Sequence, residues 1–159
     1  MSRLPPIVAT MLTVVTTSGG VAAMPKGIKA QAAPSGLVID GLPNEWVGDW
    51  RELSHTVKGS KPAKADLSAK AIVVYDSKFL YVAADVSDDK LVGGSDCVEL
   101  LLGIPGGSTA SIKLYPGVPG KTRGAAKIGG RPIRGAKVVE APKAGGYSLE
   151  AKIPWRAVP

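Results

Sequence analysis

The chain has 159 residues with 20 Lys or Arg and 13 Asp or Glu, which gives a formal net charge of +7. Gly and Pro number 20 and 13, whereas aromatic residues make up only 5%. So many turn-forming residues and so few large apolar ones favour an all-β domain over a helical one. The single cysteine, Cys97, excludes an internal disulfide, and its neighbours Val98 and Leu100 indicate a buried strand thiol.

Residues 1–23 have the features of a signal peptide. Arg3 gives a weak positive start, residues 7–15 form a modest apolar run, and Ala23 ends a small-residue pattern that a signal peptidase accepts. A second cleavage position follows Ala32. Because the apolar run is too short to span a bilayer, we expect no transmembrane segment and a secreted or periplasmic protein. A disordered N-terminus without a targeting role is the alternative.

The first part of the β domain begins after a linker at residues 24–36. Residues 37–39 are expected to form a short strand closed by the Asp40-Gly41 turn. Residues 43–46 look like one helical turn, with Trp46 as a core anchor.

The clearest hairpin joins residues 69–75 to residues 79–86 through Asp76-Ser77-Lys78, since both arms are rich in β-branched and aromatic residues. Apolar and polar residues alternate with a period of two in this second arm and in three later segments, 97–102, 110–115 and 147–153. Repeated alternation between turn signals predicts an antiparallel β-sandwich.

Two further segments complete the expected fold. Residues 137–140 are predicted to add a strand. Residues 116–135, with six Gly, three Pro and five Lys or Arg, are expected to form long loops around at most one short strand.

Five short phrases stand in a fixed order along the chain. They are Ile39-Asp40-Gly41 with Trp46, Val74-Tyr75-Asp76 to Leu80-Tyr81-Val82, Val86-Ser87-Asp88, Asp96-Cys97-Val98-Glu99, and Gly146-Tyr147 to Ile153-Pro154-Trp155. This order resembles the family 9 carbohydrate-binding modules, extracellular β-sandwich domains often attached to xylanases and other glycoside hydrolases. Because family members continue for a few strands beyond the last phrase, the resemblance implies that the domain at residues 37–159 is incomplete at its C-terminus.

The resemblance implies non-catalytic binding of an oligosaccharide or polysaccharide, linked to polysaccharide breakdown in the complete protein. Glu99 stands where the family offers a carboxylate to sugar hydroxyls, and Lys113 where members can present a basic residue. Solvated strand side chains are the alternative for both. Residues 90–95 contain no counterpart of the family's stacking aromatic, so Trp50 and Tyr115 are the remaining aromatic candidates.

The resemblance also bears on metal binding, because Asp88 stands where members can place a structural calcium ligand. Asp85, Asp89 and Asp96 lie nearby, but their spacing matches no dedicated calcium loop, which favours solvated carboxylates. No other cofactor is expected.

The rival function is a basic interaction domain that contacts an anionic glycan, a lipid surface or nucleic acid through residues 121–134. We expect no nucleic acid, because this loop lacks interleaved aromatics and the predicted signal peptide indicates export. A solvated basic loop with no partner is the alternative.

We also expect no catalysis. The single histidine, His55, follows Ser54 on a predicted strand, where neighbouring side chains point to opposite faces. A glycosidase needs two carboxylates across a cleft, and nothing in the spacing selects Glu99 and Glu150 as that pair.

Overall fold

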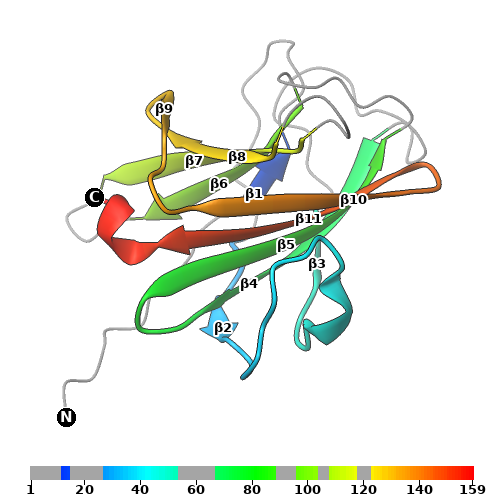
Figure 1. Cartoon of the computed structure of the whole chain (residues 1–159), viewed down its shortest axis with the longest axis horizontal. Coiled ribbons are helices and arrows are strands. Elements are labelled where there is room, and N and C mark those ends of the chain that lie inside the picture. Colours follow the sequence, from blue (N-terminus) through cyan, green and yellow to red (C-terminus); the bar gives the residue numbers. More distant parts are fainter. Residues whose placement is uncertain (1–11, 15–26, 54–66, 89–95, 104–107, 118–122) are drawn as a thin grey trace.

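The protein is an antiparallel β-sandwich, seen here in a computed structural model that describes residues 12–14, 27–53, 67–88, 96–103, 108–117 and 123–159 (Figure 1). Two sheets stack face to face, and the helical content of the described residues is limited to two short 3-10 turns. The all-β sandwich predicted from the alternating residues is therefore confirmed. Within the described residues, no helix has both the length and the apolar character needed to cross a membrane.

The smaller sheet has five antiparallel strands in the order β1-β6-β7-β8-β9. Their bounds are β1 Leu12–Val14, β6 Val98–Gly103, β7 Thr109–Tyr115, β8 Ala125–Ile128 and β9 Arg131–Pro132.

The larger sheet has six strands, ordered β10-β11-β5-β4-β2, with β3 also paired to β4. Among the described strands, β2 alone runs parallel to its neighbour, β4. The bounds are β2 Gln31–Ala32, β3 Arg51–Leu53, β4 Leu67–Tyr75, β5 Phe79–Asp88, β10 Lys137–Lys143 and β11 Gly146–Pro154. The 3-10 turns are η1 Pro43–Glu45 and η2 Trp155–Ala157.

The main core fills the space between the two sheets. It is built from the apolar half of each alternating strand, as the period of two predicts. The members that β5, β6, β7 and β11 contribute are Leu80, Val82, Ala84, Val86, Val98, Leu100, Leu102, Ala110, Ile112, Leu114, Tyr147, Leu149, Ala151 and Ile153. Burial on this scale is the principal source of stability in such a domain.

A second apolar cluster lies on the other face of the six-stranded sheet. Residues 37–50 cross this face, which lies away from the five-stranded sheet (Figure 1). Trp46 and Ile39 pack there against Ile72, Val74 and Tyr81. Trp46 is only 5% exposed, so its predicted role as a core anchor is confirmed. The six-stranded sheet is thus covered on both faces.

Two expectations about the chain path are corrected. Residues 37–39 form no strand, because the amide of Val38 donates to the Glu45 carboxylate and not to a neighbouring strand. Residues 116–135 hold two strands, β8 and β9, where at most one was expected. Gly129 and Gly130 join them with φ of +54° and +78°, as a two-residue hairpin turn requires.

The segment predicted as a linker also contributes to the fold. Ile28 and Ala30 are buried in the main core, and Gln31 begins β2.

Some residues named in the sequence analysis lie outside the described residues. They are His55, Asp89, Lys121, residues 90–95 and the cleavage position after Ala23.

Candidate functional site

Three of the predicted site residues lie on one surface, the outer side of the five-stranded sheet. Glu99 of β6 and Lys113 of β7 are direct cross-strand partners. Tyr115 follows on the same face of β7, about 7 Å further along the strand. The alternation that turns Leu100 and Ile112 into the core necessarily turns these side chains outward.

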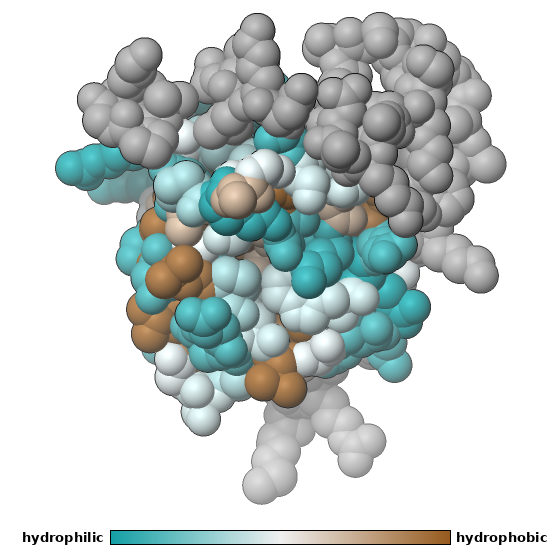
Figure 2. Space-filling view, turned by 90° about the vertical axis from the view of Figure 1, so that its right-hand side faces the viewer, coloured by the Kyte–Doolittle hydropathy of each residue, from teal (hydrophilic) through white to brown (hydrophobic). Residues whose placement is uncertain are grey.

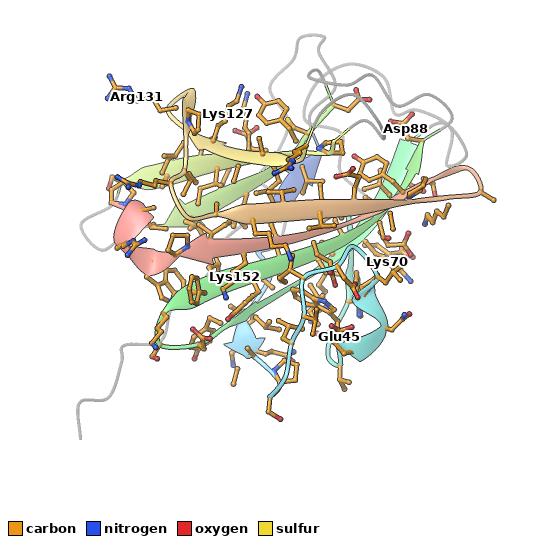
Figure 3. The ribbon with its side chains drawn as sticks, viewed as in Figure 1. Glu45, Lys70, Asp88, Lys127, Arg131 and Lys152 are labelled. Carbon is orange, nitrogen blue, oxygen red and sulfur yellow. The ribbon has the colours of Figure 1, made fainter. Side chains whose placement is uncertain are left out.

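Two more side chains complete this surface, which we call the outer polar face and define as Glu99, Ser111, Lys113, Tyr115 and Lys127. The hydroxyl of Ser111 donates a hydrogen bond to Oε1 of Glu99. Lys127 of β8 is the cross-strand partner of Lys113, and its Nζ lies 4.9 Å from the centroid of the Tyr115 ring. All five residues are half-buried. Figure 3 shows Lys127 on the side of β8 that faces away from the six-stranded sheet.

The outer polar face combines a hydrogen-bonded carboxylate, two ammonium groups and an aromatic ring. Glu99 and Lys113 form no ion pair in the part of the chain that the structure describes, although they are directly opposite. The carboxylate therefore keeps acceptor capacity beyond the Ser111 hydrogen bond, and the Lys113 ammonium keeps its donors. Such groups suit a ligand with both hydroxyls and an apolar face.

Cys97 borders this face just before β6 and is 5% exposed, which confirms the predicted buried thiol. Burial raises the pKa of the Cys97 thiol, and the nearby Lys113 charge opposes this rise only in part. A buried thiol with a raised pKa is a poor nucleophile.

Trp50 does not join the outer polar face. It is half-buried on the outer side of the six-stranded sheet, where it packs against the second cluster. Nζ of Lys70 lies 5.5 Å from its ring centroid. The whole thickness of the sandwich separates Trp50 from Glu99 and Tyr115.

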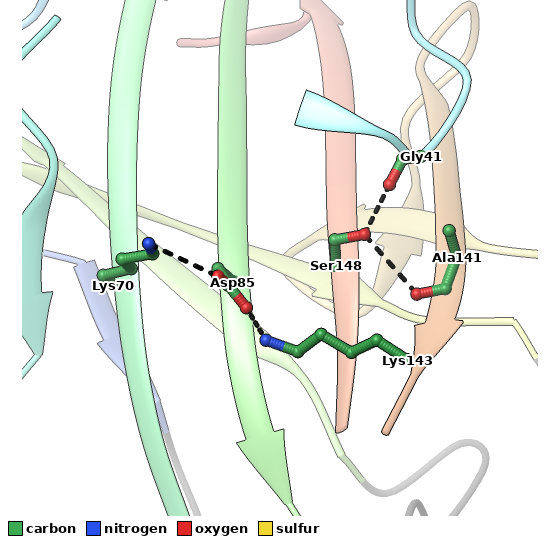
Figure 4. A network of polar contacts seen from close by, with 6 residues as sticks. All are labelled: Gly41, Lys70, Asp85, Ala141, Lys143 and Ser148. Carbon is green, nitrogen blue, oxygen red and sulfur yellow. Dashed lines mark hydrogen bonds and ion pairs between the residues drawn. The ribbon is translucent and has the colours of Figure 1, made fainter. Parts of the chain in front are cut away.

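Asp88, the calcium candidate, lies at the end of β5, and its amide donates to the Gly145 carbonyl at 3.0 Å. The neighbouring Asp85 carboxylate is engaged elsewhere, in ion pairs with Lys70 and Lys143 (Figure 4). No group of three or more His, Cys, Asp or Glu residues suited to a metal ion occurs within the described ranges.

Glu150 of β11 is a buried carboxylate with several hydrogen bonds. This arrangement was not predicted from the sequence. Glu150 is 0% exposed on the outer face of the six-stranded sheet, and its carboxylate accepts three hydrogen bonds. Oε2 accepts from the amides of Asp40 and Gly41, each at 2.7 Å, and Oε1 accepts from Nε1 of Trp46 at 2.5 Å. The Asp40-Gly41 to Trp46 phrase is therefore a loop that wraps one buried carboxylate.

Neighbouring contacts fix the same loop on the sheet. The hydroxyl of Ser148 donates to the Gly41 carbonyl at 2.5 Å and is 3.4 Å from the Ala141 carbonyl (Figure 4). Gly41 has φ of +93°, and a Cβ there would lie 2.8 Å from the carbonyl carbon of Glu140. Only glycine allows the loop to approach β10 so closely.

Burial raises the pKa of the Glu150 carboxyl, and the Glu45 charge adds to this effect. The three hydrogen bonds act in the opposite direction without cancelling the desolvation. Glu150 and Glu99 lie on the outer faces of different sheets, so these two carboxylates do not flank a common cleft.

Comparison of the sequence with models of known protein families finds no match, and comparison with curated proteins finds none either. The fold and the side chains described above are therefore the grounds on which a function is inferred.

Proposed function

We propose that this protein is a non-catalytic carbohydrate-binding module that holds an oligosaccharide or polysaccharide on its outer polar face. The observation that carries the proposal is the grouping of Glu99, Lys113 and Tyr115 on adjacent strands, with the first two as direct partners. The resemblance to family 9 carbohydrate-binding modules supports it, because that resemblance selects Glu99 and Lys113 from the sequence alone. On this proposal the protein is exported and serves polysaccharide breakdown.

The proposed binding mode uses each side chain for one task. The ring of Tyr115 packs against the apolar C–H face of a sugar, because an aromatic side chain offers a flat apolar surface. Glu99 accepts hydrogen bonds from sugar hydroxyls, held in place by Ser111, and Lys113 donates to sugar oxygens. With one ring and two charged groups, affinity is weak.

The test is calorimetric titration of the full chain with a panel of neutral and acidic glycans, including xylo- and cello-oligosaccharides. We expect measurable binding that falls about five- to tenfold in Tyr115→Ala and in Glu99→Gln, which corresponds to a loss of about 1–1.4 kcal/mol. Trp50→Ala is the matched comparison, because Trp50 is the other candidate ring and lies on the opposite sheet. The proposal fails if no glycan binds, or if only Trp50→Ala abolishes binding.

A second candidate function is a general polyanion-binding surface. Arg123, Arg131 and Arg134 are exposed before, within and after the β8–β9 hairpin, which favours contact with phosphate or sulfate groups. Salt separates the two functions, since phosphate contacts weaken steeply as salt rises and stacked neutral sugars respond little.

A further inference from the structure

The excess of basic over acidic residues is concentrated in one part of the chain. Residues 100–139 contain no Asp or Glu, and they hold seven of the 20 basic residues. The 13 basic residues elsewhere balance the 13 acidic ones, so the whole net charge of +7 lies within this stretch. Its described part forms most of β6, all of β7, β8 and β9, and the start of β10, which belongs to the six-stranded sheet.

Two of these basic residues, Lys113 and Lys127, belong to the outer polar face, while Arg123 precedes β8 and Arg131 lies in β9. Lys113, Arg123, Lys127 and Arg131 form no ion pair within the described part of the chain. Figure 3 shows Arg131 and Lys127 together at the β8–β9 end of the five-stranded sheet.

Three lysines of the six-stranded sheet have different surroundings from those of the five-stranded sheet. Lys70 and Lys143 both pair with Asp85. Lys152 lies with its Nζ 4.0 Å from the Phe79 ring centroid and exerts a charge effect on Asp76. Two lysines of the six-stranded sheet thus pair with a carboxylate, whereas Lys113 and Lys127 of the five-stranded sheet form no ion pair among the described residues.

Lys127 also decides which sugars Tyr115 can receive. Its ammonium occupies the space above the ring, 4.9 Å from the centroid. A neutral sugar must displace this cation and lose a contact worth about twofold to fivefold in affinity. A sugar that carries a carboxylate instead pairs with the displaced ammonium beside the ring.

Glu99 narrows the choice among anionic ligands. A carboxylate repels a ligand whose surface consists of phosphates, but it accepts hydrogen bonds from hydroxyl groups. The outer polar face is therefore complementary to a ligand with many hydroxyls, an apolar ring face and regularly placed negative charges. Nucleic acids and lipid headgroups supply the charges but few hydroxyl donors.

We propose that the ligand of the outer polar face is a uronic-acid-containing polysaccharide, whose hydroxyls bind Glu99 and whose carboxylates pair with Lys127 while a ring packs on Tyr115. This inference rests on the proposed function and deepens it by naming the ligand class.

The test compares oligogalacturonate with a cello-oligosaccharide of equal length, each titrated calorimetrically into the full chain at low and high salt. We expect oligogalacturonate to bind about tenfold more tightly at low salt, an advantage that shrinks as salt screens the charges. Lys127→Gln should reduce this preference. Lys152→Gln is the matched control, because it also removes a lysine that lies over an aromatic ring, but on the other sheet.

The outcomes separate the two proposals. If neutral oligomers bind as tightly as acidic ones, the ligand class is wrong while carbohydrate binding stands. If no glycan binds, carbohydrate binding itself fails. If polyphosphate or single-stranded DNA of equal charge binds as tightly as oligogalacturonate and Tyr115→Ala changes nothing, the surface is a general polyanion site and the inference is overturned.

Discussion

At the scale of single residues, Glu150 shows how a buried charge organises a loop. Its carboxylate is fully enclosed, and its three donors all come from residues 40–46, more than a hundred positions earlier in the chain. Removing an acceptor leaves buried donors unsatisfied, which costs about 1–3 kcal/mol.

We therefore predict that Glu150→Gln lowers the free energy of unfolding by about 1–3 kcal/mol, because an amide offers one acceptor oxygen where the carboxylate offers two. Urea unfolding measures the change. Glu52→Gln is the control, since Glu52 is an exposed strand glutamate of β3. Equal stability of the two variants would contradict the role assigned to Glu150.

The raised pKa of Glu150 also predicts a pH dependence of stability. The folded protein holds this proton to a higher pH than the unfolded chain, whose carboxyl titrates near the ordinary value of 4.5. Between the two pKa values the folded state binds more protons, so the stability that this carboxyl contributes falls as pH rises. Unfolding measured from pH 4 upward should show this decline in the wild type, and Glu150→Gln should lack it. Parallel profiles would refute the shift.

Cys97 provides an independent probe of the outer polar face. The thiol is buried and its pKa is raised, so it should react with DTNB at neutral pH much more slowly in the native protein than in denaturant. Absorbance of the released thiolate follows the reaction. Native and denatured rates of similar size would mean that the start of β6 is open to solvent.

At the scale of secondary-structure elements, the loop at residues 37–50 depends on how closely Gly41 approaches β10. Gly41→Ala combines left-handed strain with a Cβ placed 2.8 Å from the Glu140 carbonyl carbon. Gly36 is the matched control, because its φ of +79° is similar and nothing lies within 4 Å of its Cβ position. We expect Gly36→Ala to cost only the strain of about 1–3 kcal/mol and Gly41→Ala to cost more. Equal losses of thermal stability would contradict the close packing.

Sequence reasoning succeeded where one rule decides an element. Alternation predicted the inward faces of β6, β7 and β11, because a period of two leaves one face for the core. The β-branched and aromatic residues of both arms predicted the β4–β5 hairpin. Alternation missed the β8–β9 hairpin, whose strands are too short to show a period. The Gly129-Gly130 pair was the available signal for that turn.

The candidate site was only partly predictable. The outer polar face depends on strand register, which places Lys113 opposite Glu99 and Lys127 beside Tyr115. A single sequence does not show which residues of two strands are paired. The sequence did not show which sheet Trp50 packs against, because Trp50 lies outside any alternating segment. The Glu150 contacts span more than a hundred residues, and local patterns do not encode such long-range pairs.

At the scale of the whole molecule, the outer faces of the two sheets differ in the residues that cover them. Residues 37–50 cover much of the six-stranded sheet, and their exposed apolar side chains are Val38, Leu42 and Val47. Figure 2, which views the end of the sandwich, shows several separate brown groups among teal ones. The five-stranded sheet instead presents the outer polar face, where the Lys127 ammonium lies over the Tyr115 ring.

The most direct measurement of the central claim is amide NMR of the full chain during titration with oligogalacturonate. Ligand on the outer polar face should shift the amide resonances of Glu99, Ser111, Lys113, Tyr115 and Lys127 together, with one saturation curve. The amides of Trp50, Lys70 and Lys152 on the other sheet should stay in place. Shifts confined to the second group, or no shift in either, would contradict glycan binding by the five-stranded sheet.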